Sequence, residues 1–283
     1  MNVYIEVDME GMGITAQKMV RPDHTQWVQR GRKMATDEVN AAIKGALAAG
    51  AERVWVKDGH AGGGNLLIED LDKAAELITK STGTAHLRPG LDRSFDAVFL
   101  IGFHARAGTI GAHFDHTIST ASIHGIRLND QPVGEIGLSA AYAGFLEVPV
   151  VLVTGDKAAA REAVELLGDI ETVVVKEAYG RVSARVLSPE IVLPRIREAA
   201  ERALAEQREA WRLDTPLKVE VDFLRSAEAD MAEIVPGAER LTGRTVAYRH
   251  EDPQMAFKGL YAMVGLAGVA AGQWARAVFG SSQ

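Results

Sequence analysis

Apolar and polar positions along the chain follow two periods, one typical of strands and one typical of helices. Short runs of apolar, mostly β-branched residues predict strands at residues 3–7, 53–57, 97–101, 148–154 and 172–176, with a shorter one around 86–88. Between them, apolar residues recurring every three or four positions predict helices at 25–49 and 66–79 and an Ala-rich helix after 154. Alternation of strands and helices favours an α/β fold, a mostly parallel open sheet flanked by helices in a Rossmann-like, three-layer arrangement.

The alternation of strands and helices is interrupted in the middle of the chain. Residues 108–134 are rich in Ser, Thr, His and Gly, and they predict an irregular segment with short strands around 118–128. A long helix is predicted at 189–212, followed by a strand at 218–223 and a last helix at 253–278. We therefore expect an α/β catalytic domain at 1–212 and a smaller C-terminal α+β unit at 213–283, either separate from the first or integrated with it.

Polar residues stand at the C-terminal ends of several predicted strands. Alternation along an extended chain puts Glu6, Asp8 and Glu10 on one face, and carboxylates this close together need a neutralising partner. The residues at the strand ends are Asp8 and Glu10, Asp58 and His60, His104, and Glu135 in "PVGEIG". Because ligands bind beyond the carboxyl ends of parallel strands, these side chains are expected to converge there.

The chemistry of these residues favours a metal. The chain has no Cys, so disulfides, thiolate ligands and a cysteine nucleophile are excluded. Carboxylates and imidazoles suit one or two Zn²⁺ ions, with Mn²⁺ or Co²⁺ also compatible, and Asp8 is the natural bridging carboxylate. Taken singly, each residue is more often a helix cap, a turn, a solvated strand end or a core histidine, so spacing alone leaves both interpretations open.

Two further histidines follow in "GAHFDHT", His113 and His116. A histidine beside a metal centre can act as a general acid or base or stabilise an oxyanion, and the alternative is a polar loop that carries His by chance. The chain has no Gly-x-Ser-x-Gly nucleophile elbow and no dinucleotide fingerprint. These absences favour metal-assisted chemistry over a serine hydrolase or a nicotinamide enzyme.

Net charge and apolar runs indicate which partners and which location to expect for the protein. A formal net charge of −7 argues against nucleic acid and acidic membranes as partners. We read no signal peptide at the N-terminus, and the longest nearly apolar run, residues 259–272, is short for a transmembrane helix. We therefore expect a cytoplasmic protein with neither a membrane nor a nucleic-acid partner.

The motifs at the strand ends resemble those of a known family. They are "VDMEG" at 7–11, "DGH" at 58–60, "GFHARAGT" at 102–109 and "LNDQPVGEIGL" at 128–138. Together they are similar to the zinc-dependent D-aminopeptidases associated with bacterial dipeptide-transport operons. The resemblance extends over essentially the whole chain.

This resemblance implies a two-zinc site, a catalytic histidine and an oligomer. The residues that match the family's zinc ligands are Asp8, as the bridge, Glu10, His60, His104 and Glu135. His116 matches the catalytic histidine, because a Thr/Ser-rich segment follows it. The loop departs from the family pattern in being about one residue longer and in carrying the additional His113. Relatives form a homodecamer of stacked pentamer rings, which admits only short peptides.

The expected function is therefore that of a di-zinc metallo-aminopeptidase. It would hydrolyse short peptides, including those with an N-terminal D-amino acid, by attack of a metal-bound hydroxide. The alternatives are a metal-dependent amidase or L-peptide peptidase on the same scaffold, or a non-catalytic metal- or peptide-binding ring protein. The sequence identifies no substrate-binding residue.

Overall fold

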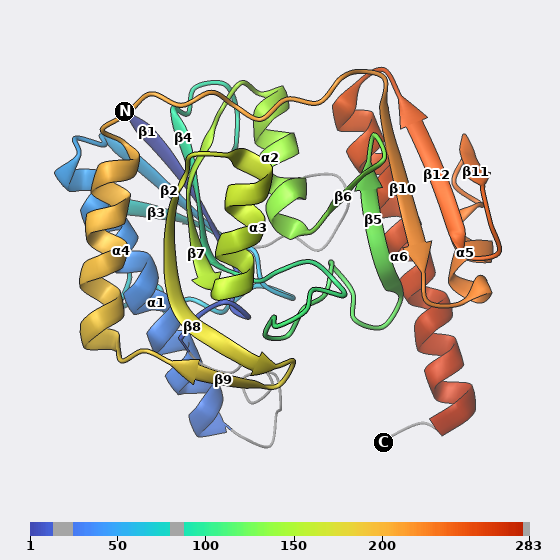
Figure 1. Cartoon of the computed structure of the whole chain (residues 1–283), viewed down its shortest axis with the longest axis horizontal. Helices are drawn as coiled ribbons and strands as arrows, with labels where there is room; N and C mark the ends of the chain where they lie inside the picture. The colour runs from blue at the N-terminus through green and yellow to red at the C-terminus, as the bar shows by residue number, and fades with distance from the viewer. Residues whose placement is uncertain (14–24, 80–87, 280–283) are drawn as a thin grey trace.

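The computed structural model describes residues 1–13, 25–79 and 88–279, which form two sheets (Figure 1). The larger sheet has the order β3-β2-β1-β4-β7-β8-β9. Its strands are β1 (Asn2–Val7), β2 (Arg53–Asp58), β3 (Ala75–Ile78), β4 (Ala97–Phe103), β7 (Val150–Asp156), β8 (Glu171–Gly180) and β9 (Ser183–Val186). Neighbouring strands from β3 to β8 are parallel, and only β9 pairs antiparallel. The predicted α/β fold with a mostly parallel sheet is confirmed.

Helices cover both faces of this sheet. They are α1 (Thr25–Ala48) and α4 (Pro189–Ala203) on one face, and α2 (Glu135–Phe145) and α3 (Lys157–Leu167) on the other. Val3, Ile5 and Val7 of β1 belong to the apolar core formed with α1 and α4, whereas Tyr4 packs in the core on the α2 side. Since both faces are covered, the inner strands β4 and β7 are buried along their whole length, and this explains their unbroken apolar runs.

The second sheet is antiparallel and has the order β11-β12-β10-β5-β6. Its strands are β5 (Ile123–Leu128), β6 (Gln131–Val133), β10 (Leu217–Phe223), β11 (Ala238–Arg240) and β12 (Thr245–His250). The helices α5 (Ser226–Ala232) and α6 (Pro253–Phe279) pack against it. Because β5 and β6 come from within 1–212, the expected C-terminal unit shares its sheet with the first part of the chain, and a domain boundary at 212 stays a prediction.

Two predicted helices differ from the structure. Residues 66–74 form turns that lead into β3. There the backbone N–H of Leu67 is bound by the Thr36 hydroxyl at 3.0 Å, and that of Asp72 by the Asn40 side chain at 2.8 Å. A helix over 66–79 would bond the Asp72 N–H internally, whereas here the Asn40 side chain of α1 accepts it, and Thr36 of α1 binds the chain at Leu67. The helix predicted to residue 212 ends at Ala203, and the strand expected around 86–88 falls mostly outside the described residues, with Arg88 in a bend.

The last helix is long and apolar enough over Pro253–Trp274 to cross a membrane by length and composition alone. This is weak evidence, because core helices pass the same test. Phe257, Leu260 and Met263 are fully buried, and they belong to the core that α6 forms with the second sheet. The packing of this face agrees with the packed C-terminal helix that the sequence predicts.

Candidate metal centre

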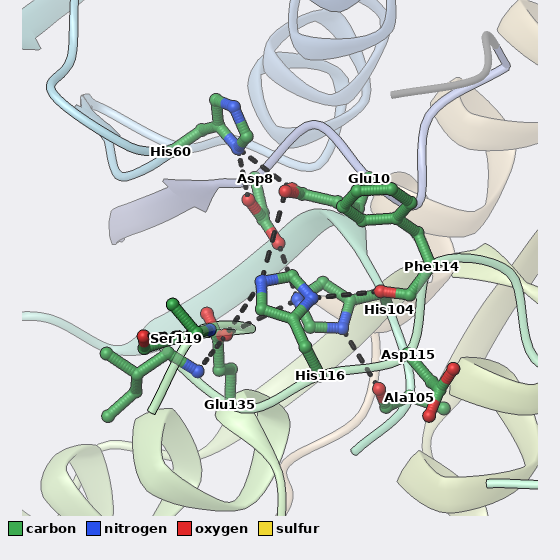
Figure 2. Close-up of polar contacts among 12 residues, drawn as sticks. Asp8, Glu10, His60, His104, Ala105, Phe114, Asp115, His116, Ser119 and Glu135 are labelled. Carbon is green, nitrogen blue, oxygen red and sulfur yellow. Dashed lines mark hydrogen bonds and ion pairs between the residues drawn. The ribbon is translucent and has the colours of Figure 1, made fainter. Parts of the chain in front are cut away.

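The polar ends of three neighbouring strands lie next to one another at the carboxyl edge of the larger sheet. Asp8 and Glu10 follow β1, His60 follows β2 and His104 follows β4. Since β1 lies between β2 and β4 in the sheet, parallel pairing brings the three ends together. Glu135 arrives by a different route, because it is the first residue of α2 and lies on the opposite side of the cluster (Figure 2).

A close backbone contact fixes the turn after β1. The Asp8 N–H donates to the Ile101 carbonyl at 2.9 Å, and the Gly11 N–H donates to the Gly102 carbonyl at 2.8 Å. A Cβ at Gly11 would lie 1.8 Å from the Phe103 carbonyl oxygen. Glycine is therefore required here for close approach between two chain segments, and this contact holds the segment with Asp8 and Glu10 against β4.

Asp8 contacts both histidines of the cluster. One carboxylate oxygen lies 3.1 Å from His60 Nδ1, and the other lies 3.3 Å from His104 Nε2. His60 Nδ1 also lies 2.8 Å from Glu10, and His104 Nε2 lies 3.4 Å from Glu135. Asp8 is thus the shared member of two adjoining groups, one with His60 and Glu10 and the other with His104 and Glu135.

Backbone carbonyls orient two of the imidazoles. His104 Nδ1 donates to the Ala105 carbonyl at 3.0 Å, and His116 Nδ1 donates to the Phe114 carbonyl at 2.9 Å. A carbonyl only accepts, so each Nδ1 carries the proton and a neutral ring presents a bare Nε2 to the carboxylates. The two rings stack, with centroids 4.1 Å apart and planes 8° apart (Figure 2).

Of the three histidines near the carboxylates, His116 has the most exposed side chain, at 12% against 8% for His60 and 1% for His104. Its Nε2 is 3.8 Å from Glu135 and 4.0 Å from Glu10, further than the His60 and His104 contacts. By contrast, His113 is buried and its ring nitrogens have no hydrogen-bond partner among the described residues. Its backbone N–H donates to the Asp156 carboxylate at 2.7 Å. The structure therefore brings His116, and not the His113 imidazole, into contact with the carboxylates.

The cluster is strongly coupled electrostatically. Burial opposes ionisation of Asp8, but the His60 hydrogen bond and the charge of His104 hold the pKa of Asp8 below its usual range. Burial and the charge of Asp8 raise the pKa of Glu10. Despite burial, hydrogen bonds to Asp8 and Glu10 raise the pKa of His60 to about 10, and Glu135 raises that of His104. Protons therefore neutralise this cluster when no cation does.

The residues fit a divalent metal ion. Asp8 Oδ2 and His104 Nε2 are buried and make no hydrogen bond within the described part of the chain. Two groups of possible ligand atoms share His104, and the atoms of each group lie within 4.8 Å of one another. One group is Asp8, Glu10 and His104, and the other is His104, His116 and Glu135. Buried polar atoms without partners are costly unless a cation binds them, and the nitrogen and oxygen donors suit zinc.

Two residues with roles at this site were not recognised in the sequence. The Lys176 ammonium is buried and donates to the Glu10 carbonyl at 2.5 Å, and the Ile118 N–H donates to the Glu135 carboxylate at 2.7 Å. A lysine at the end of the apolar run "TVVVK" was the available signal. Conversely, the Asp58 carboxylate lies away from the cluster and accepts two hydrogen bonds from Asn65, in agreement with the turn alternative.

Fold and site together define an α/β protein with a cluster of carboxylates and histidines, a candidate metal centre, at the edge of a parallel sheet. A family model described as D-aminopeptidase, of peptidase family M55, matches residues 1–262. The chain belongs to this D-aminopeptidase family, and the family resemblance predicted from its motifs is confirmed.

Individual relatives agree with this assignment. A D-aminopeptidase of Bacillus subtilis (strain 168) is 34% identical over 274 residues, which are 94% of this chain and 98% of the relative. The solved structure of the Zn-dependent D-aminopeptidase DppA from Bacillus subtilis, described as a self-compartmentalizing protease, superposes with a TM-score of 0.90. It is 32% identical, and the match covers 95% of this chain and 98% of that one.

Proposed function

We propose that this protein is a di-zinc aminopeptidase that removes the N-terminal residue, including a D-residue, from short peptides. The observation that carries the proposal is the position of Asp8, with one carboxylate oxygen on His60 and the other on His104. A carboxylate shared between two groups is the arrangement that bridges two metals in hydrolases. The zinc dependence of the similar Bacillus subtilis enzyme supports the choice of metal.

Five residues would hold the metals. They are Asp8 as the shared ligand, Glu10 and His60 on one side, and His104 and Glu135 on the other. When bound, two zinc ions supply Lewis acidity that polarises a carbonyl and lowers the pKa of water from ~15.7 towards neutrality. Mn²⁺ or Co²⁺ would suit the same nitrogen and oxygen donors.

His116 is proposed to move the proton that the reaction requires. The Phe114 carbonyl holds the proton on Nδ1, so Nε2 is the atom that takes up and releases a second proton. Nε2 points toward Glu10 and Glu135, beside the proposed ligands. A proton held there is positioned for the leaving amine, because peptide cleavage requires protonation of that nitrogen.

Short peptides are the proposed substrates, on account of the assembly. The relative is described as a self-compartmentalizing protease, and we propose that this chain likewise forms a homodecamer of stacked pentamer rings in the cytoplasm. Sites that face an inner cavity would exclude folded proteins by size.

His116→Ala tests this function, with His124→Ala as the control because His124 is exposed on β5. We expect wild type and both variants to bind zinc, since His116 is not among the five ligands. We expect His116→Ala to lose about 10²–10⁴-fold in kcat on dipeptides and His124→Ala to keep its activity. A panel of D- and L-dipeptides and amides separates aminopeptidase from amidase. Purified wild type without metal would overturn the proposed zinc site, and an active His116→Ala would overturn the proposed role of His116.

A further inference from the structure

The hairpin formed by β8 and β9 ends beside the loop that carries His116 (Figure 1). Arg181 lies in the turn of this hairpin, about 65 residues along the chain from His116. Neither the metal cluster nor the sequence motifs involve it. Its contacts are nevertheless made with the two residues immediately before His116.

Arg181 holds these two residues by backbone and side chain together. Its carbonyl accepts from the Phe114 N–H at 2.7 Å. Its guanidinium donates to the Asp115 carbonyl and lies 2.5 Å from the Asp115 carboxylate. The guanidinium also lies over the Phe114 ring, 5.4 Å from its centroid. Arg181 thus makes four contacts with the adjacent residues Phe114 and Asp115.

The held residues in turn orient the imidazole. The Phe114 carbonyl accepts from His116 Nδ1 at 2.9 Å, which determines both the direction of the ring and its tautomer. The second carboxylate oxygen of Asp115 accepts from the Gly108 N–H at 2.7 Å and closes the loop on itself. Movement of Phe114 and Asp115 would therefore move the His116 ring away from Glu10 and Glu135.

The loop needs such support because its backbone is strained. Phe114 has a φ of +54° and Ile118 a φ of +61°, a region that bulky and β-branched residues rarely adopt. Such conformations persist only where surrounding contacts impose them. The loop is held at His113 by Asp156 and at Ile118 by Glu135, and Arg181 supplies the contacts between these two points.

We propose that Arg181 is a positioning residue for the catalytic reaction, which holds the Phe114-Asp115 dipeptide so that His116 Nε2 faces the metal-binding carboxylates. This inference rests on the proposed role of His116. Arg181 itself touches none of the five proposed ligands in any described contact. Its removal is therefore expected to change the rate of the chemical step and to leave zinc binding intact.

Three variants of the full-length protein test the inference: Arg181→Ala, Arg181→Lys and Arg185→Ala. Arg185 is the matched control, because it lies on the same hairpin, is exposed and, among the described residues, pairs with Glu177. We would measure zinc content, kcat and KM on a dipeptide, and hydrogen exchange of the segment 106–118 by mass spectrometry.

We expect Arg181→Ala to bind zinc as wild type does, to lose about 10–100-fold in kcat and to change KM by less than about threefold. Exchange of 106–118 should become faster in this variant. Arg181→Lys should recover part of the rate, because a single nitrogen, Nη1, donates to both the carbonyl and the carboxylate of Asp115 and an ammonium can replace it, whereas the stacking on Phe114 is lost. Arg185→Ala should match wild type in all three measurements.

Wild-type kcat and exchange in Arg181→Ala would overturn the inference, and so would an equal loss in Arg185→Ala, because that loss would reflect the hairpin as a whole. These outcomes are distinct from failure of the proposed function. If His116→Ala is inactive while Arg181→Ala is fully active, only the inference fails. If His116→Ala is active, the proposed role of His116 fails and the inference fails with it.

Discussion

Single buried side chains near the metal centre carry unusual protonation states, and Glu38 is the clearest case away from the ligands. It is 2% exposed, one oxygen accepts from the Gly13 N–H at 2.9 Å, and the other has no hydrogen-bond partner among the described residues. Burial raises the pKa of Glu38 to about 7, although the Gly13 hydrogen bond and the charge of Lys176 oppose this. No local pattern in α1 predicts this, because the burial comes from packing.

Glu38→Gln should therefore stabilise the protein in a pH-dependent way. The folded-state pKa of about 7 exceeds the ordinary 4.5, so the folded state binds more protons between these values and wild-type stability falls as pH rises across the window. Glutamine keeps the acceptor for Gly13 and removes the ionisation. We expect the variant to gain about 2 kcal/mol over wild type between the lower and upper ends of this window.

Urea unfolding across this pH range measures the difference. Glu165→Gln is the control, because it is the same substitution at an exposed carboxylate that pairs at the surface with Arg161. A constant free-energy difference between Glu38→Gln and wild type at all pH values would contradict the prediction.

At the scale of elements, a buried ion cluster joins β1, β2 and α2. Glu6 accepts from Lys57 at 2.5 Å, from Arg88 at 3.0 Å and from Ser139 at 3.0 Å. Burial opposes ionisation of Glu6, but Arg88 and Lys57 outweigh it and lower the pKa of Glu6 to about 2. Both oxygens of Glu6 are thus bound by Lys57, Arg88 and Ser139, so Glu6 has a structural role although it shares the strand face with Asp8 and Glu10.

Glu6→Gln should destabilise the fold by about 3–5 kcal/mol, because two buried cations lose their shared counter-charge. Ser139→Ala removes one neutral partner from the same cluster and should cost only about 1 kcal/mol. Chemical denaturation of both variants with zinc present measures the two values. Equal and small losses would show that the cluster contributes little to stability.

Individual elements also show why the local sequence pattern predicts some helices and strands correctly and others wrongly. The strands β1, β4 and β7 were predicted because burial on both faces requires continuous apolar runs. The helix α2 was missed because it is buried between the two sheets and has almost no polar stripe, with Ile136, Leu138 and Ala140 all buried. The turns at 66–74 were predicted as a helix because the hydrogen bonds from α1 are not visible in the local sequence.

For the molecule as a whole, metal removal should lower stability. Without a metal, Asp8 and Glu10 repel each other in a buried site, and this repulsion is part of what raises the pKa of Glu10. A ligand that binds only the folded state at 100 times its Kd contributes about 2.7 kcal/mol. Chelation should therefore lower Tm, and added zinc should restore it.

Scanning calorimetry tests this dependence of Tm on zinc under three conditions: with chelator, with chelator already saturated by zinc, and with zinc alone. Asp8→Ala should lose the response to zinc, because it removes the ligand shared by both groups. An unchanged Tm of the wild type in all three conditions would contradict a zinc site that is part of the fold.

The sequence by itself determined the parallel sheet and the position of Asp8, Glu10, His60 and His104 at strand ends, because periodicity and strand ends are local properties. Only the tertiary structure decided that β5 and β6 join the second sheet and that Asp58 lies away from the cluster. It also decided that His116, and not the His113 ring, faces the carboxylates. These outcomes depend on contacts between segments far apart in the chain, such as Arg181 with the His116 loop, and local sequence does not encode such contacts in a readable form.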